Sequence, residues 1–387
     1  MEQTNNPLVL APMTGGMANR RSKFSLPTTH VHDAQNVLFS ATGSYSRMPG
    51  ITQVISDAGA HSITEAGGGW FYAVGAQLKF IDGNRVTHSV SSGLIPGAPV
   101  AVADTPAGVY VSDGVNRVVV RDLIVAPWLP IEPVSAPICA TTTGGLPAGE
   151  YLVAYTISDA WGAESAPSPI SSVCLPSDGM GIAVSGLPNG SLSAGERLTV
   201  YVSTGAGAQL FAYSTPTAAS ELVSTFPVGQ PLENQYAQML PPGQILIHFN
   251  GRLFSASGQF IAHSAPYRLG EYNPAQDYVL LPADVTVVTD VADGLFVGAD
   301  KLYFWQNAGT ENATMRVVSD AKCVSGTAVA APDDSVLVMS DRGVLRLGDN
   351  GRVEYLTDKT NEVTVRDVGS AGIIHHLGEW YYACVFR

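Results

Sequence analysis

The sequence predicts an all-β protein built from short antiparallel hairpins, and three observations predict this fold class. The composition is rich in turn-forming residues and poor in charge, a hairpin motif recurs along the chain, and one longer stretch interrupts the recurrence. Of the 387 residues, 40 are glycine and 25 are proline, while 45% are hydrophobic and 14% are charged. Such a chain is too apolar to be disordered and too rich in glycine and proline for a helical bundle.

The charge balance is acidic, which bears on the partners of the protein. The formal net charge is −13, whereas affinity for nucleic acid comes chiefly from Lys and Arg side chains that neutralise phosphates. The sequence therefore argues against a protein that grips nucleic acid. It is compatible with DNA that passes as cargo without specific binding, because a wall of like charge repels a polyanion.

The amino-terminal stretch and the cysteines favour a protein that folds in a cytoplasm. Residues 1–16 lack the basic region and the apolar core of a signal peptide. No apolar run approaches the roughly 20 residues of a membrane-spanning helix, so no membrane insertion is expected. The four cysteines show neither a CxxC pair nor metal-site spacing, and we expect them to be buried free thiols: Cys139, Cys174, Cys323 and Cys384.

A tight hairpin recurs whose first strand opens with a small residue followed by apolar alternation. Examples are "GWFYAVGAQLKFID" and "GLFVGADKLYFWQ". The turns inside these hairpins mostly carry the Gly or Asp that hairpin loops need. Six segments share the motif, and they begin at Gly69, Gly108, Gly251, Gly294, Ser335 and Gly378.

The spacing of these segments predicts the architecture. Neighbouring starts lie 39 to 43 residues apart, except for one interval of 143 residues that follows Gly108. A period of about 40 to 45 residues with four short strands per repeat is typical of a β-propeller blade. The sequence therefore predicts about six blades. Two repeats show all four strands, at 62–65, 70–74, 78–81 and 86–89, and at 327–330, 336–339, 344–347 and 353–356.

The long interval holds one blade and an insertion of about 100 residues, which is the size of one β-sandwich. We place this insertion at 130–243, between two proline-rich stretches that suit semi-rigid linkers. It resembles a fibronectin type III domain in "GEYLVAY" at 149–155, "ESAPSP" at 164–169 and "RLTVY" at 197–201. Apolar residues alternate in two of its segments, at Tyr151, Val153, Tyr155 and Ile157 and at Leu198, Val200 and Val202.

An early segment predicts how the propeller closes. Residues 36–54, "NVLFSATGSYSRMPGITQV", read as two short strands around a Gly-Ser turn, and the last repeat is short. Because an open propeller exposes strand edges that invite aggregation, we expect residues 36–54 to close the ring by joining the final blade. The predicted domains are an arm with the first blades at 1–129, the inserted sandwich at 130–243 and the remaining blades at 244–387.

Four of these segments, in their order, resemble the propeller-type tail hub or nozzle proteins of short-tailed bacteriophages. The resemblance is carried by Arg-Met-Pro-Gly at 47–50 after the early strand, by Gly-Arg-Leu at 251–253 followed by Ser-Ala-Pro at 264–266, and by "ADGLFVGADKLYFW" and "SDRGVLRLGDNGRVEYLT". It implies a structural virion protein that forms a homohexameric ring at the distal end of the tail. It also implies assembly in the host bacterial cytoplasm, and as partners portal and adaptor proteins, tail fibres or ejection proteins, with a DNA ejection channel that the ring lines or gates.

The sequence predicts no catalytic residue, no cofactor and no metal site. His375, His376 and Glu379 are potential metal ligands, but neighbours on a strand face opposite sides. The polar loop "HVHD" at 30–33 offers further ligands without a fourth nearby, so we expect a solvated loop.

Enzyme motifs are also missing from the sequence. Residues 340–343 faintly resemble the Asp-box turn of sialidase-type propellers, but the aromatic residue that should follow is absent, and a glycosidase needs paired carboxylates. Trp161, Tyr267 and Tyr272 could bind a sugar or a partner chain, although buried packing is the expectation for aromatics of this kind. We therefore expect no enzyme. Two alternatives stay open: another tail-tip or receptor-binding virion protein, and more distantly a carbohydrate-active propeller enzyme.

Overall fold

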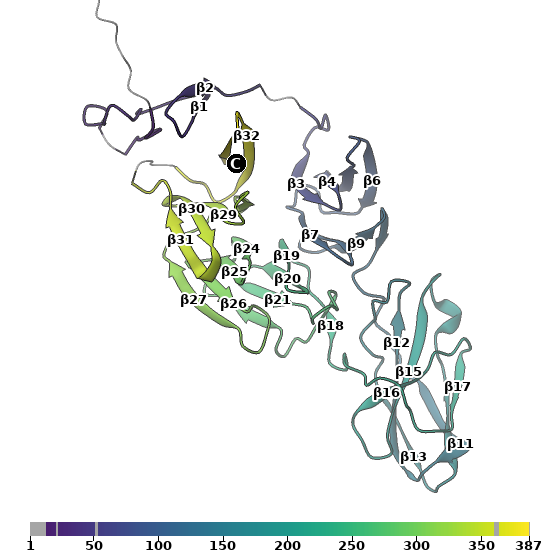
Figure 1. The fold of residues 1–387 in the computed structure, drawn as a ribbon. Helices are drawn as coiled ribbons and strands as arrows, with labels where there is room; N and C mark the ends of the chain where they lie inside the picture. Colours follow the sequence, from purple (N-terminus) through teal and green to yellow (C-terminus); the bar gives the residue numbers. More distant parts are fainter. Residues whose placement is uncertain (1–12, 21, 51–52, 360–363, 387) are drawn as a thin grey trace, which may run out of the picture. The chain divides into compact units, whose positions relative to one another are not determined.

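The computed structural model describes residues 13–20, 22–50, 53–359 and 364–386 (Figure 1). Across these residues the regular structure consists of β-strands and two 3₁₀ turns, Asn189–Ser191 and Asp349–Gly351, which confirms the all-β prediction. The chain divides into two compact units, one made of Met1–Ala58 with Leu281–Arg387 and the other of Gly59–Leu280.

The Gly59–Leu280 unit contains three four-stranded antiparallel sheets in which strands follow one another in chain order. Neighbouring strands are joined by tight turns, such as the one after Val74 in which Gly75 has a φ of 56°. The first sheet has β3 (His61–Ala66), β4 (Gly69–Val74), β5 (Gln77–Ile81) and β6 (Thr87–Ser92). The second has β7 (Ala101–Thr105), β8 (Gly108–Ser112), β9 (Arg117–Arg121) and β10 (Ile124–Ala126), and the third β19 (Ile245–Phe249), β20 (Arg252–Ser257), β21 (Phe260–His263) and β23 (Tyr278–Leu280).

The other unit contains two more sheets of the same kind and two isolated hairpins. One sheet has β24 (Val287–Val291), β25 (Gly294–Gly298), β26 (Leu302–Gln306) and β27 (Thr314–Ser319). The next has β28 (Val329–Ala330), β29 (Val336–Ser340), β30 (Gly343–Gly348) and β31 (Arg352–Tyr355). The hairpins are β1 (Val37–Phe39) with β2 (Tyr45–Arg47), and β32 (Gly369–His376) with β33 (Glu379–Phe386).

Within each unit, consecutive sheets pack face to face through hydrophobic cores, which is how propeller blades are stacked. Phe71, Leu78, Val109 and Val111 belong to one core that joins the first two sheets. A second core, around Trp128, joins the sheet of β7–β10 to that of β19–β23. In the other unit, one core includes residues of both β24–β27 and β28–β31. The fold is therefore built of β-propeller blades.

Packing explains why a small residue stands at the start of a blade hairpin. A Cβ atom on Gly69 would lie 2.3 Å from the carbonyl oxygen of Ile81 and 2.5 Å from the ring of Phe80. A Cβ atom on Gly294 would lie 2.6 Å from the carbonyl oxygen of Trp305 and 2.8 Å from the ring of Phe304. In both blades an aromatic ring of the neighbouring strand occupies the space, so only glycine fits.

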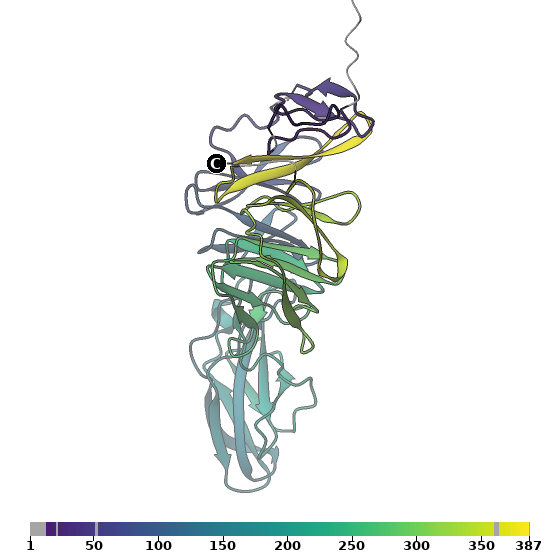
Figure 2. The same ribbon diagram turned by 90° about the vertical axis from the view of Figure 1, so that its left-hand side faces the viewer.

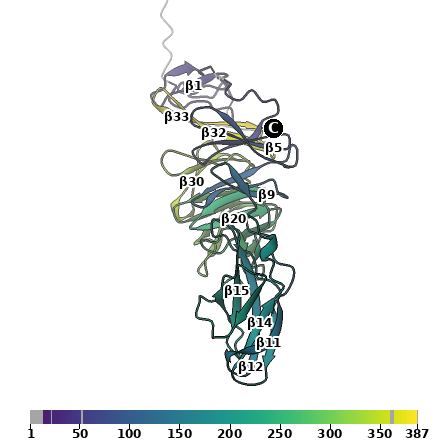
Figure 3. The same ribbon diagram turned by 90° about the vertical axis from the view of Figure 1, so that its right-hand side faces the viewer.

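The insertion folds as a β-sandwich (Figure 3). One sheet has the order β11 (Ile138–Leu146), β14 (Met180–Ser185), β17 (Ser220–Val223), and the other β13 (Ser171–Leu175), β12 (Gly149–Ser158), β15 (Arg197–Ser203), β16 (Leu210–Ser214). The predicted alternation is reproduced in part. Six of its residues meet in one core: Tyr151, Val153, Tyr155, Leu198, Val200 and Val202. Ile157 is half-buried and lies outside this core, and Ala154 and Thr156 are buried as well. Two-sheet sandwiches of this kind occur in fibronectin type III domains and in many other domains. The fibronectin type III assignment therefore stays a prediction.

The expected strand pairing between residues 36–54 and the final blade is wrong for the described residues. β1 and β2 pair only with each other, as do β32 and β33, and residues 51 and 52 lie outside the described part. The two hairpins instead lie side by side, joined through the carboxylate of Glu379 (Figure 2). β1 and β2 have three residues each, too short a ladder to complete a blade whose strands have eight.

The predicted number of blades is reproduced in part. Five of the six predicted blade hairpins lie in four-stranded sheets, whereas the one that begins at Gly378 lies in the two-stranded sheet of β32 and β33. A sixth complete blade stays a prediction, as does the division of the chain at 129 and 243.

Candidate functional site

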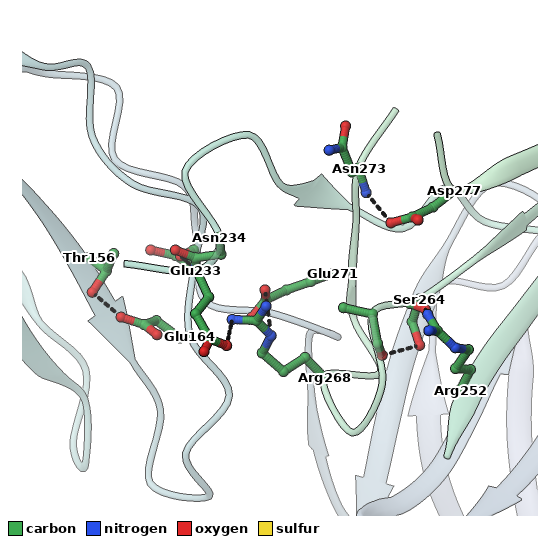
Figure 4. Close-up of polar contacts among 12 residues, drawn as sticks. Thr156, Glu164, Glu233, Asn234, Arg252, Ser264, Arg268, Glu271, Asn273 and Asp277 are labelled. Atoms are coloured by element: carbon green, nitrogen blue, oxygen red, sulfur yellow. Dashed lines mark hydrogen bonds and ion pairs between the residues drawn. The ribbon is translucent and has the colours of Figure 1, made fainter. Parts of the chain in front are cut away.

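Polar residues gather where the sandwich meets the blade of β19–β23, and we call them the junction cluster: Glu164, Glu233, Asn234, Arg268 and Glu271 (Figure 4). Glu164 follows β12 of the sandwich, and Glu233 and Asn234 lie in the segment that leaves the sandwich. This segment ends in β18 (Gln238–Met239), which pairs with β22 (Glu271–Tyr272) of the blade side. The short β18–β22 ladder thus brings the acidic residues of both parts together.

Glu271 is the most buried carboxylate of the junction cluster. Its residue surface is 2% exposed, and its Oε2 lies 3.5 Å from Nε of Arg268 without hydrogen-bond geometry. Burial raises the pKa of Glu271 to about 7; Arg268 opposes this rise, while Glu164 and Glu233 add to it. The Glu271 carboxyl therefore titrates near neutral pH.

Arg268 connects the two parts electrostatically. Its Nη1 lies 3.5 Å from Oε2 of Glu233, and its Nε faces Glu271. The Glu233 side chain is largely exposed, so this outer ion pair is weak in water. One guanidinium thus faces two carboxylates of different burial, and it holds the blade loop against the segment that leaves the sandwich.

Glu164 is fixed by the sandwich itself. Its Oε1 accepts hydrogen bonds from the hydroxyl of Thr156 at 2.5 Å and from that of Tyr201 at 2.8 Å. Burial, reinforced by the charge of Glu164, raises the pKa of Tyr201. Both partners donate, so two hydrogen bonds fix the position of the Glu164 side chain at the edge of the junction cluster.

Asn234 is 1% exposed and joins the outgoing segment to the sandwich. Its Nδ2 donates to the carbonyl oxygen of Ser165 at 2.9 Å, while within the described part of the chain its Oδ1 has no hydrogen-bond partner. A buried acceptor without a partner costs about 1 to 3 kcal/mol. Within the described residues, the protein therefore leaves polar atoms of the junction cluster, Asn234 Oδ1 and Glu271 Oε2, without a hydrogen-bond partner of its own.

A second link between sandwich and blades is formed by Arg121, at the end of β9. Its Nη1 lies 3.6 Å from Oδ2 of Asp159, and both side chains are mostly buried. Its Nε donates to the carbonyl oxygen of Ala107 at 2.6 Å, and its guanidinium lies 4.8 Å from the ring centroid of Trp161. Two separate sets of polar contacts therefore hold the sandwich.

A groove of about 630 Å³ lies beside the junction cluster. It is lined by Glu132, by residues 166–170 of the sandwich, by residues 235–238 of the outgoing segment and by residues 273–275 of the blade. The backbone N–H of Asn273 donates to Oδ2 of Asp277 at 2.8 Å and fixes the blade wall (Figure 4). The volume lies in the range of small-ligand sites.

The potential metal ligands weighed in the sequence do not form a site. The rings of His375 and Trp380 are tilted against each other with centroids 4.3 Å apart, and Glu379 accepts hydrogen bonds from Ala41 and Tyr381. His30 contacts its neighbour Thr29. Across the residues that the structure describes, no group of three His, Cys, Asp or Glu side chains is arranged to hold a metal ion.

The Asp-box-like segment forms a structural turn. The hydroxyl of Ser340 donates to the carbonyl oxygen of Gly343 at 2.8 Å and accepts the N–H of Arg342 at 3.1 Å. Oδ1 of Asp341 accepts the N–H of Lys322 at 2.9 Å. All of these hydrogen bonds join the side chains of the turn to backbone groups of the fold, so the turn has a structural role.

Burial was predicted wrongly for two of the three aromatics. Trp161 is half exposed, and the guanidinium of Arg121 lies over its ring. Tyr267 is 86% exposed at a φ of 60°. Tyr272 packs against the core around Trp128, as expected. All four cysteines are free, but the expectation that they are buried holds only for Cys323. Cys139 and Cys384 are half-buried, and Cys174 is exposed on β13.

Apart from Glu164, which opens the "ESAPSP" segment, the residues of the junction cluster were not singled out in the sequence. Arg268 and Glu271 stand three positions apart in "YRLGEYNP". Glu164 and Glu233 lie far away in sequence and reach Glu271 only through tertiary structure. The one local signal of a buried carboxylate was the Glu between Gly and Tyr at 270–272.

Comparisons with known proteins give no family. No family model and no curated protein matches the chain. Similar solved structures are selenomethionine-substituted virginiamycin B lyase from Staphylococcus aureus, with 12% identity, a TM-score of 0.35 and coverage of 86% of this chain and 94% of that one. The extracellular domain of a putative hybrid two-component system from B. thetaiotaomicron has 12% identity and a TM-score of 0.33, and the match covers 83% of this chain and 38% of that one. The Pan2 WD40 domain of Neurospora crassa has 10% identity and a TM-score of 0.31, and the match covers 79% of this chain and 82% of that one. At these values the neighbours carry no argument, and the fold assignment rests on the sheets of this chain. No helix of the described residues is long and apolar enough to span a membrane.

Proposed function

We propose that this chain is a structural virion protein that forms the distal tail hub or nozzle ring of a bacteriophage and lines or gates the DNA ejection channel. The observation that carries the proposal is the hydrogen bonding within one of the motifs on which the resemblance rests. The Gly-Arg-Leu strand at 251–253 and Ser-Ala-Pro at 264–266 form one hydrogen-bonded unit. Its residues are used for structure, as expected of a structural protein.

This unit ties the first strand of a blade hairpin to the segment that leaves the hairpin. Nη1 of Arg252 donates to the carbonyl oxygen of Ser264 at 2.8 Å, and the N–H of Leu253 donates to its hydroxyl at 2.9 Å (Figure 4). Leu253 and Ser264 are fully buried. The motif residues therefore specify how the chain turns back after β21, which is a structural role.

Charge and assembly fit the same proposal. A ring of six copies would multiply the formal charge of −13 and repel DNA from its wall, so that DNA slides through. A closed ring requires head-to-tail contacts between copies, which the blade flanks or the inserted sandwich, with its proposed fibronectin type III character, would supply. The proposed partners are further copies of this chain, the portal and adaptor proteins, and tail fibres or ejection proteins.

Electron microscopy of the purified protein tests the proposal. We expect rings with sixfold symmetry, and six-copy assemblies in native mass spectrometry. A trimer would favour the second candidate, a peripheral receptor-binding protein of the virion. A strictly monomeric protein that hydrolyses glycans would contradict both and favour an enzyme.

A further inference from the structure

The groove beside the junction cluster has a lining whose chemistry restricts its ligand. It contains one carboxylate, Glu132, and the side-chain amides of Gln235, Gln238 and Asn273, but no Lys, Arg or His. A phosphate, sulfate or nucleic-acid strand would find no cation there, and the chain as a whole carries a net charge of −13. The ligand that fits this lining is not an anion and is rich in hydrogen-bonding groups.

An aromatic platform lies among these amides. Tyr236 is 73% exposed and lines the groove together with Gln235 and Gln238. Oδ1 of Asn273 accepts the N–H of Ala275 at 3.0 Å, which orients the amide and leaves its Nδ2 as a donor. An exposed ring beside an oriented amide suits a molecule with one apolar face and several hydroxyl groups.

The backbone of the groove is rigid before any ligand arrives. Pro167 and Pro169 lie in the sandwich wall and Pro274 in the blade wall, and each proline ring fixes its φ. The hydroxyl of Ser168 is already used, because it accepts the N–H of Tyr155 and donates to the carbonyl oxygen of Pro169. A preorganised groove loses less entropy on binding, which favours a weakly interacting ligand such as a sugar.

We propose that this groove binds a neutral oligosaccharide, with the ring of Tyr236 stacked on the apolar face of one sugar unit. The amides of Gln235, Gln238 and Asn273 would bond the hydroxyl groups, and Glu132 would accept from a further one. The volume of about 630 Å³ accommodates a short segment of a glycan chain. The inference depends on the groove alone and stands independently of the proposed virion role.

The full-length protein is tested on an array of neutral and sulfated oligosaccharides, followed by titration of the best ligand in isothermal calorimetry. We expect saturable binding of one or more neutral glycans and none of the sulfated ones. Failure of every neutral glycan to bind, or preferential binding of a sulfated one, would overturn the inference. So would saturable binding of a proline-rich peptide to this groove in place of a glycan.

Variants locate the binding. Tyr236→Ala is expected to weaken the glycan at least tenfold, because one stacked ring is lost, whereas Tyr236→Phe keeps the ring and should bind nearly as the parent does. The matched control is Tyr267→Ala, which removes another highly exposed tyrosine that does not line the groove. Equal affinities of Tyr236→Ala and the parent protein would contradict the assignment. Melting curves of all variants check that each remains folded.

Discussion

The backbone N–H of Ala41 donates to both carboxylate oxygens of Glu379, at 3.0 and 3.2 Å, across 338 positions of sequence. Ala41 lies in the turn between β1 and β2, and Glu379 opens β33. The hydroxyl of Tyr381 donates to the same carboxylate at 3.1 Å. A side chain therefore attaches the amino-terminal hairpin to the last hairpin where a ladder of strands was expected.

Replacing Glu379 by Ala should loosen this attachment. The bond is exposed, so its loss should cost about 1 kcal/mol or less and leave the midpoint of global unfolding nearly unchanged. Local opening of β1 and β2 should increase, because few other contacts hold two strands of three residues. Hydrogen exchange of residues 37–47 measures it, and we expect faster exchange there. Glu354→Ala, which removes another exposed carboxylate of the same unit, is the control; equal exchange in both variants would refute the attachment.

The raised pKa of Glu271 predicts a pH dependence of stability. The carboxyl binds its proton up to about pH 7 in the folded chain, but only to about 4.3 in an unfolded one. Between these values the folded state holds more protons, so the free energy of unfolding falls as pH rises from about 4.3 to 7. The stabilisation is fully present below this window and absent above it. Urea unfolding at pH 5 and pH 8 measures the difference.

Glu271→Gln isolates this contribution. An amide has no proton to lose, so the variant should be more stable than the parent at pH 8 and should show a smaller change between pH 5 and pH 8. Glu233→Gln is the matched control, since it alters an exposed carboxylate that faces the same Arg268. If Glu271→Gln kept the full pH dependence of the parent, the proton would have to bind elsewhere.

Gly294 tests the packing reason for the blade openings. In Gly294→Ala the new methyl group would meet the Trp305 carbonyl and the Phe304 ring, so we expect a loss of about 1 to 3 kcal/mol in the free energy of unfolding. Gly372→Ala is the matched control, because this glycine also lies in a strand but a Cβ atom there would meet nothing within 4 Å. Equal unfolding free energies of the two variants would show that the small residue serves another purpose.

Features that depend on neighbouring residues in the chain could be predicted from the sequence. Blade hairpins are local, and their turn glycines and alternating strands are visible in ten or so residues, which is why the starts at Gly69, Gly108 and Gly294 coincide with β4, β8 and β25. The inward alternation of Tyr151 and Val153 was likewise visible. These features follow from strand periodicity and turn chemistry.

Contacts between distant segments could not be predicted in this way. Nothing in the sequence of residues 36–54 distinguishes a hairpin that pairs with β33 from one that receives a single carboxylate, because both need only two short strands and a turn. The raised pKa of Glu271 results chiefly from burial beside the β18–β22 ladder, which the charges of Glu164 and Glu233 reinforce and that of Arg268 opposes. Such an environment exists only in the folded chain, so the candidate site was found in the structure.

The linkers of the sandwich set the boundary at which it can be removed. Trp128 is fully buried and its Nε1 donates to the carbonyl oxygen of Val118 at 2.9 Å. Leu240 is equally buried in the same core, and its carbonyl oxygen accepts Nη1 of Arg117 at 2.8 Å. Removal of residues 130–243 would take Leu240 from the blades, so the predicted boundary cuts into their core.

Two deletions, each closed with a flexible Gly-Ser linker, test the boundary. Without residues 138–232 the blades keep Trp128 and Leu240, and we expect β-sheet circular dichroism with a cooperative thermal transition. Without residues 130–243 the loss of buried Leu240 should lower the free energy of unfolding by about 2 to 5 kcal/mol relative to the first deletion. Equal transitions would show that Leu240 contributes nothing to the blades. Loss of structure in both would mean that the blades need the sandwich to fold.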